Sequence, residues 1–282
     1  MPDAQLAQYI SSAGSAFALG SYERAARFYG LALQRARAMD ESLEVGKQAY
    51  NLAASLVLAG NATNALPYLT EAESTFARLR KDRGPVVLLR ARALRAVGDT
   101  ERARLEIQRV VELNTSGDIQ CQGWLLYGQL SADAGDLGEA AKALSRARRL
   151  LSDDPALRAG VASLAGRLAL LENNAGGAGL EYDKEAEFMR RARRYADMAE
   201  AFSRAGAAYA ADGNTDAAGY RFYRAARSWQ GQGRPVEALR AVEQALALPV
   251  GDTEPAWGAA VAALVEEIRR TPVAGAPADA LE

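Results

Sequence analysis

The chain has 282 residues, and its 34 basic and 35 acidic residues give a formal net charge of -1. Hydrophobic residues make up 49% and charged residues 24% of the composition, which is typical of globular proteins and argues against disorder. The near-zero charge excludes the strongly basic footprint of a nucleic-acid-binding protein, so no nucleic-acid partner is expected. Histidine is absent and Cys121 is the only cysteine, which excludes intrachain disulfides, cysteine metal clusters and histidine-dependent catalysis.

The sequence is compatible with two alternative cellular locations. No apolar run approaches the roughly 20 residues that cross a bilayer, and the polar Pro2-Asp3 directly after Met1 does not begin a signal peptide. The terminal Leu281-Glu282 resembles a cloning scar, which keeps open an export signal that has been removed. The protein is therefore expected in the cytoplasm, or in the periplasm or as a lipoprotein. Only four of the 34 basic residues are lysines, which together with abundant Ala and Gly indicates a GC-rich bacterial genome.

A turn pattern recurs along the chain and divides it into repeats. A Gly or Asn is followed by a polar residue and, five positions after the first, by a small Ala. The copies lie at Gly20–Ala25, Gly60–Ala65, Gly98–Ala103 and Gly135–Ala140, with weaker copies at Asn173–Ala178, Gly213–Ala218 and Gly233–Ala238. Successive alanines are 40, 38, 37, 38, 40 and 20 positions apart. A period of this size is the signature of a helical repeat array.

Each copy of the pattern predicts a helix, a tight turn and a second helix. The Gly or Asn can adopt the left-handed conformation that ends the first helix, and the following Ser, Asn or Asp can cap the second. The Ala lies one turn into the second helix, where two helices cross too closely for a larger side chain. Apolar residues at helical spacing flank the turns, and no alternating pattern of a β-strand competes with them. The sequence therefore predicts an all-α fold.

The later repeats follow this scheme with variations. Arg90 stands where the third repeat should have an apolar core residue, so the register is expected to slip there by one residue. Ser152-Asp153-Asp154-Pro155 ends one helix and begins the next, with Pro at a first-turn position that tolerates its missing donor. The half-repeat spacing of 20 predicts one helix over Thr215–Gln230 that serves two turns, followed by a helix over Arg234–Leu248.

A closing helix is predicted over Pro255–Arg270. Its apolar face carries Trp257, Val261, Leu264 and Ile268. Terminal helices of this kind cover the exposed end of a repeat core. Thr271–Glu282 is rich in Ala, Pro and Gly and is predicted to be a disordered tail.

Three stretches resemble the spaced signature of the tetratricopeptide repeat. They carry Ala13, Ala16, Tyr22, Ala25, Tyr29 and Ala32; then Trp124, Tyr127, Gly128, Gly135, Asp136, Ala140, Leu144, Ala147 and Pro155; and then Phe202, Gly206, Tyr209, Gly213, Ala218, Phe222 and Ala225. The resemblance covers residues 4 to 250, and the period of 37 to 40 is similar to the long-period variants of the family. It implies a right-handed α-solenoid of about six helix-turn-helix repeats over residues 1–250, a capping helix over 251–271 and a disordered tail over 272–282.

In this family the first helix of each pair lines a concave face, so the resemblance implies a groove for a protein or peptide. Transferred repeat by repeat, its lining residues are Lys47, Tyr50, Leu88, Arg92, Arg95, Gln122, Leu125, Gln129 and Arg167. The Lys and Asn clamp with which the chaperone-binding class holds a terminal carboxylate is not matched. Arginines interleaved with aromatic and apolar residues predict a peptide with acidic and apolar side chains. The alternative is that these arginines only keep the groove soluble.

No constellation of residues suggests catalysis. Phosphate-binding and dinucleotide-binding glycine motifs are absent, and adjacent acidic residues on a helix face different directions. No enzyme activity, cofactor or metal is therefore predicted. The first hypothesis is a scaffold or adaptor in a bacterial complex, for instance in envelope assembly or secretion. The second is the ligand- or peptide-sensing module of a bacterial regulator whose effector domain is absent from this sequence.

Overall fold

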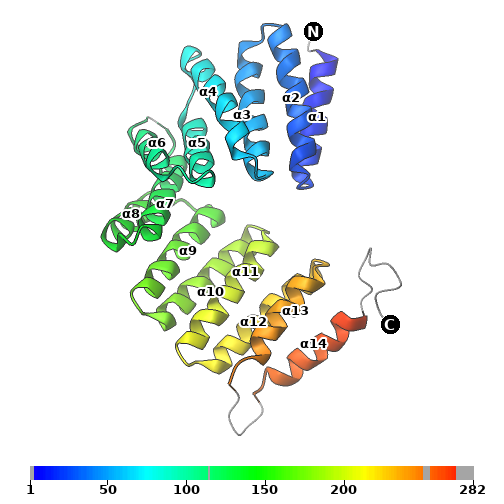
Figure 1. Cartoon of the computed structure of the whole chain (residues 1–282), viewed down its shortest axis with the longest axis vertical. Coiled ribbons are helices and arrows are strands. Elements are labelled where there is room, and N and C mark those ends of the chain that lie inside the picture. Colours follow the sequence, from blue (N-terminus) through cyan, green and yellow to red (C-terminus); the bar gives the residue numbers. More distant parts are fainter. Residues whose placement is uncertain (1–2, 114, 250–254, 271–282) are drawn as a thin grey trace. The chain divides into compact units, whose positions relative to one another are not determined.

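The structure, a computed structural model, describes residues 3–113, 115–249 and 255–270. In these ranges the regular elements are all α-helices, and no strand occurs. The helices are α1 (Ala4–Ala18), α2 (Tyr22–Ala38), α3 (Ser42–Leu58), α4 (Ala62–Arg78), α5 (Gly84–Ala96), α6 (Thr100–Glu112), α7 (Gly117–Asp133), α8 (Leu137–Arg149), α9 (Pro155–Leu171), α10 (Ala175–Arg191), α11 (Tyr195–Ala211), α12 (Thr215–Gly231), α13 (Pro235–Leu246) and α14 (Gly258–Arg270) (Figure 1). The predicted all-α fold class is confirmed.

The chain divides into two compact units. Unit 1 contains α1 to α7 together with Ser145–Leu150, and unit 2 contains Gly135–Leu144 and α9 to α14. Inside each unit a helix packs mainly on its neighbours in the sequence, from α1 to α7 in unit 1 and from α9 to α13 in unit 2. First helices of consecutive pairs also touch, as α3 does with α5 and α5 with α7. This nearest-neighbour packing is that of a repeat protein.

The predicted turns are confirmed by the backbone. Every predicted glycine has a positive φ, from 69° at Gly233 to 84° at Gly98, and Asn173 has a φ of 59°. At the second turn the left-handed residue is Gly60. The amide of Asn61, which follows it, donates to the Leu56 carbonyl at 2.8 Å, and this hydrogen bond closes the end of α3. Left-handed residues between repeats were not predicted; they are Asp40, Arg80 and Arg193.

The predicted caps are confirmed only in part. The side chains of Asp99, Asp136, Asn174 and Asn214 accept hydrogen bonds from backbone amides of the helices that follow them. Ser21 and Asn61 occupy the same position before α2 and α4, but their side chains make no capping hydrogen bond. The capping prediction is therefore wrong at these two residues.

Small residues let the helices cross closely. The alanine of every turn copy, from Ala25 to Ala238, is 0% exposed, as the crossing argument requires. Helical glycines also lie beneath aromatic rings: a Cβ built on Gly206 would lie 2.8 Å from the ring of Phe222. Replacing these residues with larger ones would force the helices apart.

The C-terminal helices differ slightly from the prediction. The helix over 215–230 extends to Gly231, and the next helix runs over Pro235–Leu246. The closing helix begins at Gly258, not Pro255, because the backbone before it forms a turn. Its predicted apolar face is buried, and Trp257 packs where Gly219 of α12 leaves room for its ring. The predicted tail over 272–282 lies outside the described residues.

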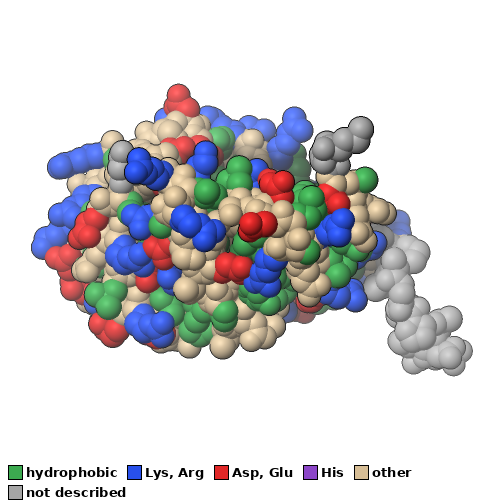
Figure 2. All heavy atoms as spheres, turned by 90° about the horizontal axis from the view of Figure 1, so that it is seen from above, with side chains coloured by type: hydrophobic (Ala, Val, Ile, Leu, Met, Phe, Trp, Pro, Cys, Tyr) green, Lys and Arg blue, Asp and Glu red, His purple; other side chains and the backbone are tan. Residues whose placement is uncertain are grey.

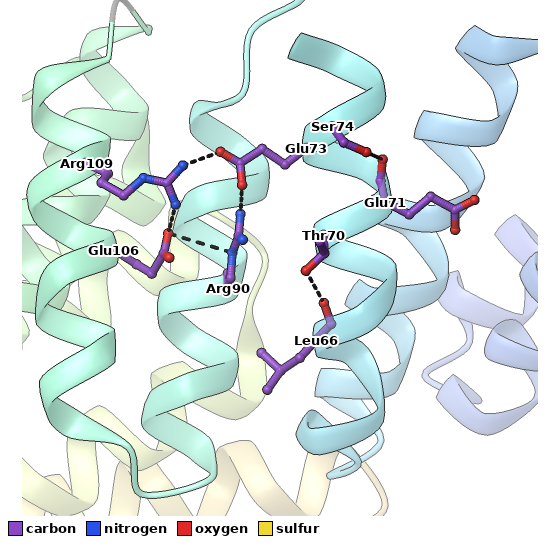
Figure 3. A network of polar contacts seen from close by, with 8 residues as sticks. All are labelled: Leu66, Thr70, Glu71, Glu73, Ser74, Arg90, Glu106 and Arg109. Atoms are coloured by element: carbon purple, nitrogen blue, oxygen red, sulfur yellow. Dashed lines mark hydrogen bonds and ion pairs between the residues drawn. The ribbon is translucent and has the colours of Figure 1, made fainter. Parts of the chain in front are cut away.

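Arg90 of α5 is accommodated by an ion network and not by an apolar partner (Figure 3). Its guanidinium binds the Glu73 carboxylate of α4 and lies 3.7 Å from Glu106 of α6. Arg109 of α6 also binds Glu73 and lies 2.6 Å from Glu106. Two arginines and two glutamates thus connect α4, α5 and α6. The network explains Arg90 at this position without the shift of register that the sequence suggested.

Candidate interaction surface

Six of the predicted groove residues lie on three adjacent first helices of unit 1. Lys47 and Tyr50 lie on α3, Arg92 and Arg95 on α5, and Gln122 and Gln129 on α7. Hydrogen bonds and a charge interaction link five of these side chains across the helices, and Lys47 lies on α3 three positions before Tyr50. We call these six residues the α3–α5–α7 strip.

Hydrogen bonds cross the strip from one helix to the next. The Arg92 guanidinium donates to Oε1 of Gln122 at 2.7 Å, and Arg95 donates to Oε1 of Gln129 at 2.6 Å. Arg95 also lies 3.3 Å from the carboxylate of Asp133 near the end of α7. Arg92, in contrast, forms no ion pair among the described residues, and its guanidinium donates a hydrogen bond to a neutral amide.

Arg92 and Tyr50 interact electrostatically between α5 and α3. Burial lowers the pKa of the Arg92 guanidinium, although its side chain is exposed to water, and the charge interaction with Tyr50 acts against this shift. Burial raises the pKa of the half-buried Tyr50 hydroxyl, and Arg92 lowers it. Tyr50 and Arg92 are therefore neighbours across the junction of α3 and α5.

Three predicted groove residues do not belong to the strip. Leu88 is 2% exposed and packs in the core with Leu94 and Ile107, so it cannot line an open surface. Leu125 is 7% exposed and is likewise part of the core. Arg167 lies half-buried on α9 in unit 2.

The charges around the strip differ in how far they are compensated. Lys47 pairs with Glu44 of its own helix at 2.8 Å. Arg95 shares its charge with Asp133, a residue that the sequence analysis missed because it lies two positions before the turn glycine and outside the repeat signature. Arg92 is the strip's best candidate to pair with an acidic ligand.

Unit 2 has a smaller hollow of about 390 Å³ between α11 and α13. Two of its three arginines are engaged: Arg204 donates to Glu185 at 2.7 Å and to Ser163 at 3.0 Å, and Arg234 lies 4.4 Å from the centre of the Trp229 ring. Burial raises the pKa of Glu185, whereas Arg204 lowers it.

The basic run at the end of α10 is largely neutralised. Glu187 lies 2.9 Å from Arg190 and 3.0 Å from Arg191, and Asp197 lies 2.6 Å from Arg194. The hydrogen bonds from Arg190 and Arg191 lower the pKa of Glu187 to about 2. On the face in Figure 2, basic and acidic side chains are interspersed. These pairs make the end of α10 an exposed helix face whose charges are largely balanced.

The described part of the chain carries neither a metal-binding cluster nor a membrane-spanning helix. No group of three or more acidic, cysteine or histidine side chains there could hold a metal ion. None of the helices there is long and apolar enough to span a membrane. Cys121 is buried, its thiol lies 3.4 Å from the Ala147 carbonyl, and burial raises its pKa to about 11. A thiol held protonated in this way is a poor nucleophile at neutral pH.

The comparisons with known proteins give matches only among solved structures. Neither the protein-family models nor the curated proteins match the chain. BtubC (BKLC) from P. vanneervenii is similar over 75% of this chain and 92% of its own, with 19% identity and a TM-score of 0.61. A tetratricopeptide repeat protein from Parabacteroides merdae is similar over 95% of this chain and 100% of its own, with 13% identity and a TM-score of 0.50.

The APC/C hetero-tetramer Cut9–Hcn1 is similar over 88% of this chain, with 13% identity and a TM-score of 0.57. This chain covers 48% of the matched chain, and so spans about half of its length. At identities this low the likeness concerns the fold. Together with the buried turn alanines, the left-handed turn glycines and the nearest-neighbour packing, it shows that the chain has a tetratricopeptide-like, all-α helical repeat fold.

Proposed function

We propose that the protein is a non-catalytic interaction scaffold and that the α3–α5–α7 strip of unit 1 binds a peptide segment with acidic and apolar side chains. The observation that carries the proposal is the environment of Arg92. Its guanidinium donates to the neutral amide oxygen of Gln122 at 2.7 Å, and no carboxylate of the described residues pairs with it. A carboxylate from a partner would supply the opposite charge that the described residues do not provide.

The rest of the strip suits the backbone and apolar side chains of such a segment. The amides of Gln122 and Gln129 each have both donor and acceptor atoms, so they can bind peptide groups as well as the arginines. Tyr50 offers an aromatic ring beside Arg92, and aromatic residues together with arginine dominate the energetics of many interfaces. An extended or helical segment lying across the three helices would contact all of these groups.

The fold supports this class of function more broadly. A repeat stack exposes long surfaces formed by several elements, and a similar solved structure, Cut9–Hcn1, is itself a hetero-tetramer. The assignment to a bacterial envelope or secretion complex stays a prediction from the sequence.

The proposal can be tested with a displayed library of random twelve-residue peptides, selected on the wild-type protein. The expected binders are enriched in Asp or Glu together with apolar residues. The double variant Arg92→Glu, Arg95→Glu should weaken binding by about 100-fold, because like charges then face each other.

Arg102→Glu is the matched control. Arg102 lies on α6 in the same unit, its side chain is 65% exposed, and it is no part of the strip. This variant should bind the selected peptides as the wild type does. Equal binding by the wild type and the double variant would rule out the strip as the binding surface.

A further inference from the structure

A second surface of unit 1 is a hollow of about 850 Å³ formed by α2, α3 and α4. One face of α2 lines it from Glu23 to Arg37, the last two turns of α3 form its floor with Leu52 and Leu56, and the start of α4 forms the other wall. It shares no residue with the α3–α5–α7 strip. The volume is in the range of binding pockets.

The corresponding place one repeat later is filled. The turn glycines Gly60 and Gly98 are 38 positions apart, so Leu52 corresponds to Arg90, and Tyr68 to Glu106. Arg90 and Glu106 take part in the ion network that joins α4, α5 and α6 (Figure 3). Between α2 and α4, a single ion pair of Arg37 with Glu71 at 2.5 Å closes one end. The remaining length has an apolar floor and is open.

Two residues that disfavour helices lie in the walls of this hollow. Gly30 is in the middle of α2, where a Cβ would meet no atom within 4 Å. Helix packing therefore gives no reason for a glycine there, and an alanine would be more favourable. Pro67 lies inside α4, where it removes a helical hydrogen bond. A longer side chain at position 30 would extend into the hollow, so Gly30 keeps this part of it open.

The polar groups of the hollow are mainly uncommitted amides. Asn61 stands at the capping position of α4 but makes no capping hydrogen bond. Asn64 of α4 and Gln34 of α2 also line the hollow, and both are exposed. Amides donate and accept hydrogen bonds, as peptide groups do. The formal charges sum to zero, because Arg37 is paired with Glu71 and the lining carries one further arginine, Arg27, and one glutamate, Glu23. The complementary ligand is therefore uncharged.

We infer that this hollow binds an uncharged, apolar peptide segment of a partner protein in an extended conformation. Its side chains would pack on Leu52, Leu56 and Pro67, and its backbone would hydrogen-bond with Asn61, Asn64 and Gln34. The lining face of α2 is about 21 Å long from its rise per residue. This length accommodates about six extended residues.

The test uses acetylated and amidated hexapeptides made of Ala, Val, Leu, Ser and Tyr on an array, with a matched array that carries Asp or Lys at two central positions. We expect the wild type to bind uncharged members, and the best one to be measured by titration calorimetry with a Kd below about 1 mM. Gly30→Leu fills the hollow with a residue that favours helices, so it should fold and yet bind that peptide at least about ten-fold more weakly.

The matched control is Gly14→Leu, because Gly14 is also a helical glycine with no atom within 4 Å of an added Cβ and lies on α1 outside the hollow. It should bind as the wild type does, as should Arg92→Glu. Thermal unfolding checks that both leucine variants are folded. The inference is overturned by unchanged binding in Gly30→Leu, by preference for the charged array, by loss of binding in Arg92→Glu, or by no hexapeptide binding to the wild type.

Discussion

The guanidinium of Arg90 on α5 donates a hydrogen bond to the carboxylate of Glu73 on α4, and the two side chains are only 13% and 12% exposed. Removing Arg90 leaves two nearly buried carboxylates, Glu73 and Glu106, with the single positive charge of Arg109. Arg90→Ala should therefore lower the free energy of unfolding by about 3 kcal/mol. Urea denaturation measures this change. Arg102→Ala, which removes an exposed pair with Asp99, should cost about 0.5 kcal/mol; equal effects of the two would contradict the role of the network.

The same network predicts how stability depends on pH. Burial raises the pKa of Glu73, but hydrogen bonds and charges from Arg90 and Arg109 outweigh it and hold the pKa below its ordinary value. A carboxylate with a lowered pKa in the folded state stabilises the fold above its unfolded pKa of about 4.3, and this stability is lost as the pH falls through the folded pKa. Wild type and Glu73→Gln should therefore differ at pH 7 and converge below about pH 4.3. A difference that stays constant down to pH 3 would show that Glu73 is not held ionised.

The glycines beneath aromatic rings should not tolerate a methyl group. Gly206→Ala would place its Cβ 2.8 Å from the ring of Phe222, so α11 and α12 must separate or the ring must move. We expect a loss of about 1–3 kcal/mol in the free energy of unfolding. Gly14→Ala, where nothing lies within 4 Å, should instead gain about 0.5–1 kcal/mol from helix propensity. Denaturant titrations of the two variants compare them directly, and a gain in both would contradict the packing at Gly206.

The only cysteine should be inert while the protein is folded. Cys121 is 0% exposed and burial raises the pKa of its thiol to about 11. At pH 8 a thiol reagent such as Ellman's reagent should therefore react with the native protein far more slowly than with the protein in denaturant. Fast labelling of the native protein would mean that α7 opens locally.

The sequence predicts those features that depend on local chemistry. Gly98 and Asn173 are recognisable because few residues adopt a left-handed turn, and Ala103 because a close crossing admits only a small side chain. Asp40 and Arg193 also adopt left-handed conformations, but residues of these types are common throughout the chain and so give no signal.

Features that depend on packing across repeats could not be predicted. Leu88 and Arg92 are both on α5, and only the neighbouring helices decide that the first is buried and the second exposed. The partner of Arg90 is 17 positions away on another helix, so the repeat pattern shows an anomaly without showing its solution. The hollow beside Gly30 becomes visible only once α2, α3 and α4 are packed.

The most direct test of the central claim, that the arginines of the α3–α5–α7 strip bind an acidic and apolar peptide, is an exchange of charges between protein and peptide. One selected peptide and its version with every Asp and Glu changed to Lys are titrated against the wild type and against the Arg92→Glu, Arg95→Glu variant. The wild type should bind the acidic peptide at least about ten-fold more tightly, and the variant should prefer the lysine peptide. An identical preference in both proteins would contradict the claim.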